Sequence, residues 1–196
     1  MDSNRELCLN PSQTQHIFVM RTVAERLQDT PYILKGGTAL ILTRSLDRYS
    51  TDLDFDSEQK INLAGRIEIA LKTIREIELR SLKLVKDTDT VQRYKIHYVD
   101  HLTGKDTLLK IETSFRQSPP PQAVETVDGI KTYKIEYLFD QKLKAAQNRT
   151  VSRDLYDLAF LVEKFGAQLR DEQIEAVQQF VADPDLARIG VEGEAA

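Results

Sequence analysis

The sequence predicts an α+β fold in which a mixed central sheet is flanked by helices and followed by a helical C-terminal segment. Strand-like segments gather between residues 32 and 133, whereas segments with helical periodicity lie mainly at the two ends. The chain has 196 residues, enough for one hydrophobic core and a small helical appendage. We therefore expect a core over residues 1–133, a helical segment over 134–185 packed on it, and a loose tail over 186–196.

The first elements are predicted by caps, turns and periodicity. Asn10 and Pro11 form a cap and a first helical residue, and the helix that follows ends near Pro31. A short apolar strand then precedes Gly36-Gly37, where the chain turns into a helix beginning near Thr38. The remaining expectations are a strand over 52–56, a helix over 61–79, antiparallel strands over 82–85, 91–99 and 107–112, a hairpin over 124–133, and helices over 134–148, 153–165 and 171–181.

Composition limits the class of protein. Apolar residues make up 41% of the chain and charged residues 30%, the balance of an ordinary globular protein. We find no apolar run of membrane-spanning length and no leader, and the single cysteine, Cys8, excludes an internal disulfide. These features predict a cytoplasmic protein with no membrane contact.

Charge is unevenly distributed along the chain. The formal net charge is −4, so the whole surface is not the positive field of a protein that coats nucleic acid. The stretch from Lys131 to Arg153 nevertheless carries a local excess of basic residues. We interpret this stretch as a candidate basic surface.

Gly36, Gly37 and Thr38 lie where a strand passes into a helix. Glycines at such a turn let the backbone approach a phosphate group, and the free N–H groups of the first helical turn attract it. A pair of glycines that only makes a tight turn is the alternative interpretation.

Asp52 and Asp54 are the strongest candidates for chemistry. One residue separates them on a predicted strand, so both carboxylates point to the same face, close enough to share hard cations such as Mg²⁺. Leu53 and Phe55 are expected to fix this strand in the core. The alternative is a solvated acidic edge.

Glu112 is a candidate third acid. It ends an apolar segment, and alternation places it on the same face as Lys110. If this strand lies beside residues 52–54, three carboxylates converge, and two metal ions could neutralise the phosphates and activate an attacking hydroxyl. An exposed glutamate at a strand end is the alternative.

Lys142 and Arg149 are two helical turns apart, so they share one helix face. Cations there could neutralise charge on departing pyrophosphate, although a solvated helix face predicts the same spacing. Asp154 and Asp157 could simply complement the dipole of the next helix. The three histidines show no spacing typical of metal ligands, and no serine lies in a nucleophile-elbow context.

Several segments together resemble the AbiEii/AbiGii toxin family of nucleotidyltransferases, a branch of the DNA polymerase beta superfamily. They are Gly36-Gly37-Thr38-Ala39-Leu40, Arg48 to Phe55, Lys142 to Ala146, and Arg149 with Arg153 to Leu158. The resemblance implies a polymerase beta-type catalytic core over residues 1–133 and a metal-dependent enzyme. It implies metal binding by Asp52, Asp54 and Glu112, catalytic roles for these three with Lys142 and Asp157, and nucleotide binding by Gly36, Gly37, Thr38, Arg48, Ser50 and Lys142.

The predicted activity is transfer of a nucleoside monophosphate from a nucleoside triphosphate to a hydroxyl group, with release of pyrophosphate. Mg²⁺ is the expected cofactor, in a two-metal site, with Mn²⁺ as the alternative ion. The family context favours RNA, tRNA in particular, as acceptor and a cognate antitoxin as partner. A small molecule or protein acceptor, and a non-catalytic nucleotide-binding or antitoxin-like protein, are the competing hypotheses.

Overall fold

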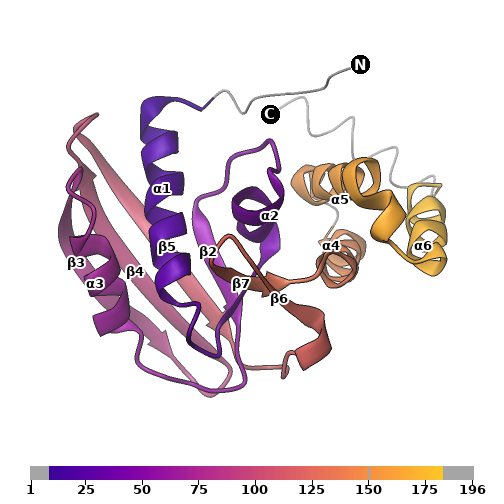
Figure 1. Cartoon of the computed structure of the whole chain (residues 1–196), viewed down its shortest axis with the longest axis horizontal. Helices are drawn as coiled ribbons and strands as arrows, with labels where there is room; N and C mark the ends of the chain where they lie inside the picture. The colour runs from indigo at the N-terminus through magenta and orange to yellow at the C-terminus, as the bar shows by residue number, and fades with distance from the viewer. Residues whose placement is uncertain (1–8, 150, 183–196) are drawn as a thin grey trace. The chain divides into compact units, whose positions relative to one another are not determined.

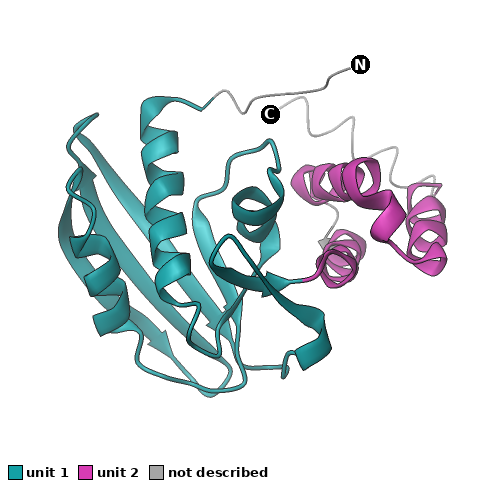
Figure 2. Cartoon of the chain, viewed as in Figure 1, with its two compact units in different colours: residues 1–133 teal, residues 134–196 magenta. Residues whose placement is uncertain are grey.

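The computed structural model describes residues 9–149 and 151–182. Contacts between residues divide the chain into two compact units, Met1–Tyr133 and Lys134–Ala196 (Figure 2). We call them unit 1 and unit 2. The tail expected over 186–196 lies outside the described residues.

Unit 1 contains a seven-stranded mixed sheet in the order β3-β4-β5-β2-β1-β7-β6. The central strand β2 is parallel to β5 and antiparallel to β1, and β1 is parallel to β7. The strands are β1 (Ile33–Lys35), β2 (Asp52–Asp56), β3 (Ile77–Asp87), β4 (Val91–Asp100), β5 (Lys105–Ser114), β6 (Val124–Val127) and β7 (Ile130–Tyr133). With the helices described below, this sheet confirms the predicted α+β class.

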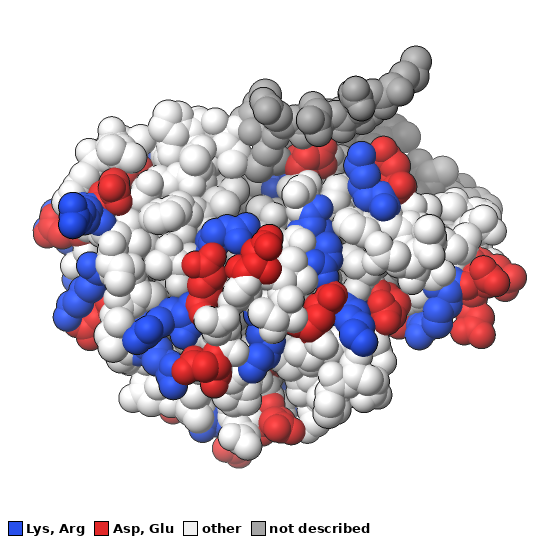
Figure 3. All heavy atoms as spheres, viewed as in Figure 1, with Lys and Arg blue, Asp and Glu red and all other residues white. Residues whose placement is uncertain are grey.

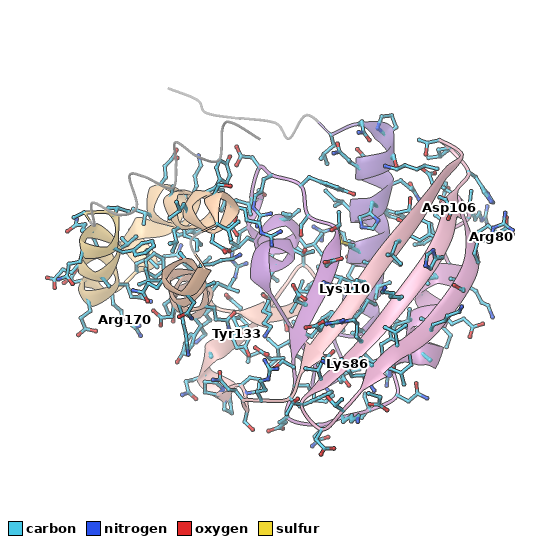
Figure 4. The ribbon with its side chains drawn as sticks, turned by 180° about the vertical axis from the view of Figure 1, so that it is seen from behind. Arg80, Lys86, Asp106, Lys110, Tyr133 and Arg170 are labelled. Atoms are coloured by element: carbon cyan, nitrogen blue, oxygen red, sulfur yellow. The ribbon has the colours of Figure 1, made fainter. Side chains whose placement is uncertain are left out.

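Helices α1 (Pro11–Arg26) and α3 (Ala64–Lys72) lie over one face of the sheet (Figure 1). Tyr94 and Ile96, two of the side chains that β4 turns toward them, are at most 1% exposed. We call this the covered face. The opposite face of β3, β4 and β5 has no helix over it when the molecule is seen from behind (Figure 4), and we call it the open face.

Alternation along β2 determines which of its side chains lie on the open face. Leu53 and Phe55 are 0% and 1% exposed, and their burial stabilises the strand by about 2–3 kcal/mol each. Because side chains alternate along a strand, Asp52 and Asp54 must lie on the opposite side. The core therefore holds this acidic segment in place.

Two expectations about the middle of the chain were wrong. The helix expected over 61–79 ends at Lys72, and β3 begins at Ile77 instead of residue 82. Ile74 and Ile77 continue the helical spacing of Ile67 and Leu71, but Ile77 belongs to an edge strand. Register shifts between Leu79 and Ser81, and between Leu84 and Lys86, interrupt the alternation that would identify this strand.

The third α-helix described in unit 1, α2 (Gly36–Arg44), follows β1 directly, and a 3₁₀ turn (Pro121–Ala123) precedes β6. Unit 2 consists of α4 (Ile135–Arg149), α5 (Ser152–Phe165), a 3₁₀ turn (Gly166–Gln168) and α6 (Asp171–Val181). No helix within residues 9–149 and 151–182 is long and apolar enough to cross a membrane.

Candidate active site

The turn between β1 and α2 brings backbone close to a site carboxylate. Gly36 has a φ of +75°, a left-handed conformation that glycine adopts without strain. A Cβ atom added there would lie 3.6 Å from Oδ2 of Asp54. The first turn of α2, where backbone N–H groups lack helical partners, thus starts beside this aspartate.

Gly37 leaves room for the side chain of Arg48. A Cβ atom at Gly37 would lie 2.1 Å from Nη2 of Arg48, so the guanidinium group occupies the space directly above the glycine. This contact joins the two residues at the start of α2. The free N–H groups at a helix N-terminus attract anions, and an arginine beside them adds positive charge. The two together are suited to binding phosphate.

Hydrogen bonds hold the loop before β2 against α1 and α2. The hydroxyl group of Thr38 lies 2.9 Å from that of Ser50 and donates to the Asp52 carbonyl oxygen at 2.5 Å. Thr38 is only 3% exposed, so its hydroxyl group acts as an internal brace. Ser50 is more accessible to solvent, and the hydrogen bond with Thr38 orients its side chain.

His16 braces the same loop from α1. Its Nε2 atom lies 2.9 Å from the Thr51 carbonyl oxygen, and its Nδ1 atom lies 2.6 Å from the Tyr98 hydroxyl group. Burial lowers the pKa of His16, which favours a neutral ring. Sequence reasoning missed this residue, because no spacing pattern links it to Thr51 or Tyr98.

Strand register brings the three predicted acids to one region of the sheet. In the parallel pairing of β2 and β5, Asp54 lies opposite Glu112 and Asp52 lies opposite Lys110. Antiparallel pairing then places Arg93 of β4 opposite Glu112. The condition set for convergence of the three acids, a strand containing Glu112 beside residues 52–54, is therefore met.

Cations balance two of these carboxylates. Lys110 Nζ lies 2.7 Å from Asp52 Oδ2, and Arg93 Nε donates to Glu112 Oε2 at 2.6 Å. Burial raises the pKa of Asp54; Lys110 opposes the shift, and the charges of Asp52 and Glu112 add to it. The hydrogen bond to Asp52 raises the pKa of Lys110, which stays protonated.

The donor set suits a hard cation. Mg²⁺ is commonly held by one or two carboxylates together with substrate phosphates, and Asp52 and Asp54 offer oxygen ligands of this kind. In the part of the chain that the structure describes, no three acidic, histidine or cysteine side chains are arranged to hold a metal ion jointly. Glu112 is paired with Arg93, so its role as a third ligand stays a prediction.

A third aspartate of β2 has a different environment. Asp56 accepts a hydrogen bond from Lys35 Nζ at 2.6 Å and another from the Tyr133 hydroxyl group at 3.0 Å. Burial and the Asp56 charge raise the pKa of Tyr133. These contacts join β1, β2 and β7, and they give Asp56 a structural role that the sequence did not reveal.

The other predicted residues lie in unit 2. Lys142 of α4 is 7% exposed, and its Nζ atom lies 2.5 Å from Asp157 Oδ2 and 3.5 Å from Asp154 Oδ1 on α5. Both aspartates are fully buried. The cluster joins two helices, and catalytic roles for Lys142 and Asp157 stay predictions.

The basic stretch from Lys131 to Arg153 is not a continuous surface. Lys142 is buried, and Lys131 Nζ donates to the Thr30 carbonyl oxygen at 2.6 Å. The stretch also crosses the boundary between the two units. It is therefore a weaker candidate for binding a nucleic acid than its composition indicated.

Two solved structures from Helicobacter pylori are similar to this chain. JHP933 matches with 38% identity and a TM-score of 0.84, over 90% of this chain and 77% of that chain. A protein described as a candidate nucleotidyltransferase matches with 38% identity and a TM-score of 0.83, over 90% of this chain and 80% of that chain. No curated protein matches significantly.

The family comparison agrees with the geometry of the β1–α2 turn and the acidic strand. Residues 18–192 match the model for "Nucleotidyl transferase AbiEii toxin, Type IV TA system". The match covers most of the chain, including the turn at Gly36, the carboxylates of β2 and the helices of unit 2. This chain belongs to the AbiEii nucleotidyltransferase toxin family.

Proposed function

We propose that this nucleotidyltransferase transfers a nucleoside monophosphate from a nucleoside triphosphate to a hydroxyl group of RNA, tRNA in particular. Nucleotidyl transfer and the triphosphate substrate follow from the family. The observation that carries the proposal is the register of β2 and β5, which gathers Asp52, Asp54 and Glu112 beside the start of α2.

In the proposed reaction, the acceptor oxygen forms a bond to the α-phosphorus atom. The bond from that phosphorus to the oxygen bridging to the β-phosphate breaks, pyrophosphate leaves, and the hydroxyl proton passes to solvent. Backbone N–H groups at Gly36 and Gly37 hold the phosphates, and Arg48 and Lys110 neutralise their charge. Thr38 and His16 keep the loop before β2 in position.

Asp52 and Asp54 would hold Mg²⁺, or Mn²⁺ as the alternative ion, with Glu112 as the predicted third ligand. When bound, the ions neutralise the phosphates and lower the pKa of the attacking hydroxyl group. Arg93 contacts only Oε2 of Glu112, so Oε1 would be the oxygen that joins such a site.

The family name places the chain in a type IV toxin–antitoxin context, which implies an antitoxin. We propose that modification of RNA in the cytoplasm is its toxic activity, and that a cognate antitoxin counteracts it. The acceptor assignment is supported by basic side chains of unit 1, Lys110 and Lys95 among them, that continue outward from the carboxylates.

The test is a nucleotidylation assay with purified protein, RNA, Mg²⁺ and each triphosphate in turn, followed by mass analysis of RNA and protein. Asp54→Asn should lower activity at least about a hundredfold, since it removes a group acting on transition-state charge. Its melting temperature without metal should equal or exceed that of the parent, because ionised Asp54 is half-buried beside two other acids.

Asp106→Asn is the matched control, because Asp106 is an exposed acid at the far end of β5. It should keep both activity and melting temperature. Equal loss of activity in the two variants would contradict the assigned site. Labelling of the protein or of a metabolite, with RNA never labelled, would contradict the acceptor.

A further inference from the structure

Basic side chains form a row across the open face, starting at a site carboxylate. Asp52 lies opposite Lys110 in the β2–β5 pairing, Lys110 lies opposite Lys95 in the β5–β4 pairing, and Lys95 lies opposite Lys83 in the β4–β3 pairing. Residues opposite each other in neighbouring strands share a sheet face. We call Lys110, Lys95 and Lys83 the lysine row.

A second row runs parallel to the first. Asp54 lies opposite Glu112, Glu112 opposite Arg93, and Arg93 opposite Lys86. Lys86 and Lys110 are both seen on the open face, where no helix covers the strands (Figure 4). Each row thus passes from carboxylates at β2 to a lysine at the outer strand β3.

The lysine row is unfavourable for the isolated protein. Lysines directly opposite each other repel, and such pairs destabilise a sheet. Lys83 and Lys95 are exposed, and neither forms an ion pair with another residue that the structure describes. An anionic ligand would remove this repulsion.

Other parts of unit 1 lack this concentration of charge. On the helix-covered side, acidic and basic side chains lie next to each other (Figure 3). The aromatic residues of β4, Tyr94 and Tyr98, are buried on the covered face, and β3 and β5 contain none. The open face of these three strands therefore offers charge for a phosphate backbone, and its only ring is the exposed imidazole of His97, with no Phe, Tyr or Trp on which bases could stack.

We infer that the lysine row holds the phosphate backbone of the RNA acceptor as it approaches the site, an inference that rests on the proposed function. Strands lie about 4.8 Å apart, so the row extends about 14 Å from Asp52 to Lys83. Continuity with the site, charge, and the lack of Phe, Tyr and Trp on this face of β3, β4 and β5 all indicate a polyanionic strand bound with little preference for base sequence.

The test compares Lys83→Gln/Lys95→Gln with the parent in binding a fluorescein-labelled single-stranded RNA over a range of salt concentrations. Each lost phosphate contact should flatten the slope of log affinity against log salt by about 0.7, or about 1.4 for both. If both proteins bind alike near 1 M salt, the variant should bind about 25-fold more weakly near 0.1 M.

Lys72→Gln/Arg75→Gln is the control, because it removes the same charge from exposed positions on α3 and the loop after it. It should keep the parental slope. The lysine-row variant should bind a fluorescent triphosphate as the parent does and should melt no lower, since a repulsive pair has been removed.

Three outcomes would overturn the inference. Parental RNA affinity and slope in the lysine-row variant would reject this surface while leaving the RNA acceptor intact. Equal loss in the control would assign the effect to net charge alone. If the parent itself binds no RNA and labels another acceptor, the proposed RNA acceptor fails together with this surface.

Discussion

Two clusters of lysine and aspartate in this chain have similar chemistry but different exposure. In unit 1, the side chains of Lys110 and Asp52 are 32% and 34% exposed. In unit 2, the side chains of Lys142 and Asp157 are 9% and 0% exposed. The first pair can exchange partners with a ligand at low cost, because water already solvates both groups.

The buried pair has no such freedom. Separating Lys142 from Asp157 would leave a charge in an apolar environment, and this penalty exceeds the value of the pair itself. The comparison teaches that the same residue types serve a site where they are partly exposed and join helices where they are buried. The contact between α4 and α5 gives Lys142 and Asp157 a structural role, and their catalytic roles stay predictions.

The largest expected effect comes from breaking the buried cluster. Lys142→Ala should lower the free energy of unfolding by about 3–5 kcal/mol, because Asp157 loses its cation within the helical unit. Urea denaturation measures the loss. Lys144→Ala, at an exposed position of the same helix, is the control and should change stability by at most about 0.5 kcal/mol.

A different result would revise the comparison. If Lys142→Ala keeps parental stability but loses nucleotidyl transfer, the lysine is catalytic and its contact with Asp157 is incidental. If stability and activity fall together, measuring activity only on the folded fraction separates the two effects.

The sequence predicted the parts of the site that strand periodicity determines. Asp52 and Asp54 alternate with buried Leu53 and Phe55, and this pattern was enough to place both carboxylates on one face. Glu112 could be assigned to that face by the same alternation. Only its position opposite Asp54 required the parallel pairing of β2 and β5, which joins segments far apart in the chain.

What the sequence could not predict depends on contacts between distant segments. Arg93 binds Glu112 only because β4 pairs with β5, and Asp56 meets Tyr133 across β1. The start of β3 was missed for a local reason, since Ile77 follows Ile74 at helical spacing and the alternation that begins at Ile77 is interrupted by the register shift after Leu79. Lys95 and Lys83 had no distinguishing spacing until strand register aligned them.

An intermediate effect is expected where a buried residue supports the exposed cluster. His16→Gln should lower the free energy of unfolding by about 1–3 kcal/mol at neutral pH, because the hydrogen bonds to Thr51 and Tyr98 are disturbed in a buried place. Activity should also fall, since the loop leading to Asp52 loses a support.

The pH dependence of the free energy of unfolding tests whether His16 supports the loop as a neutral ring. Burial lowers the pKa of His16 below its ordinary value of 6.5, so the unfolded chain binds the proton more readily than the folded one. The stability tied to the neutral ring is present above about pH 6.5 and is lost as pH falls through the folded pKa. Parent and His16→Gln should therefore differ less in stability at acidic pH, with exposed His97→Gln as control, and a constant difference would contradict the assignment.

The smallest effects on stability are expected at Gly36 and Gly37. Substitutions there should also separate most clearly the effect on stability from the effect on triphosphate affinity. Gly36→Ala places a side chain at a φ of +75° and should cost about 1–2 kcal/mol. Gly37→Ala meets only the mobile end of Arg48, and the gain in helix propensity offsets the displacement, so its stability should change by at most about 0.5 kcal/mol. Its affinity for triphosphate should nevertheless fall several-fold, because Arg48 leaves the start of α2.

Thermal melting measures the stability of both glycine variants, and binding of a fluorescent triphosphate measures their nucleotide affinity. Parental nucleotide affinity in Gly37→Ala would mean that Arg48 does not contact the phosphates and that Gly37 serves the turn alone, whereas weakened binding at unchanged stability would assign the guanidinium group to the triphosphate.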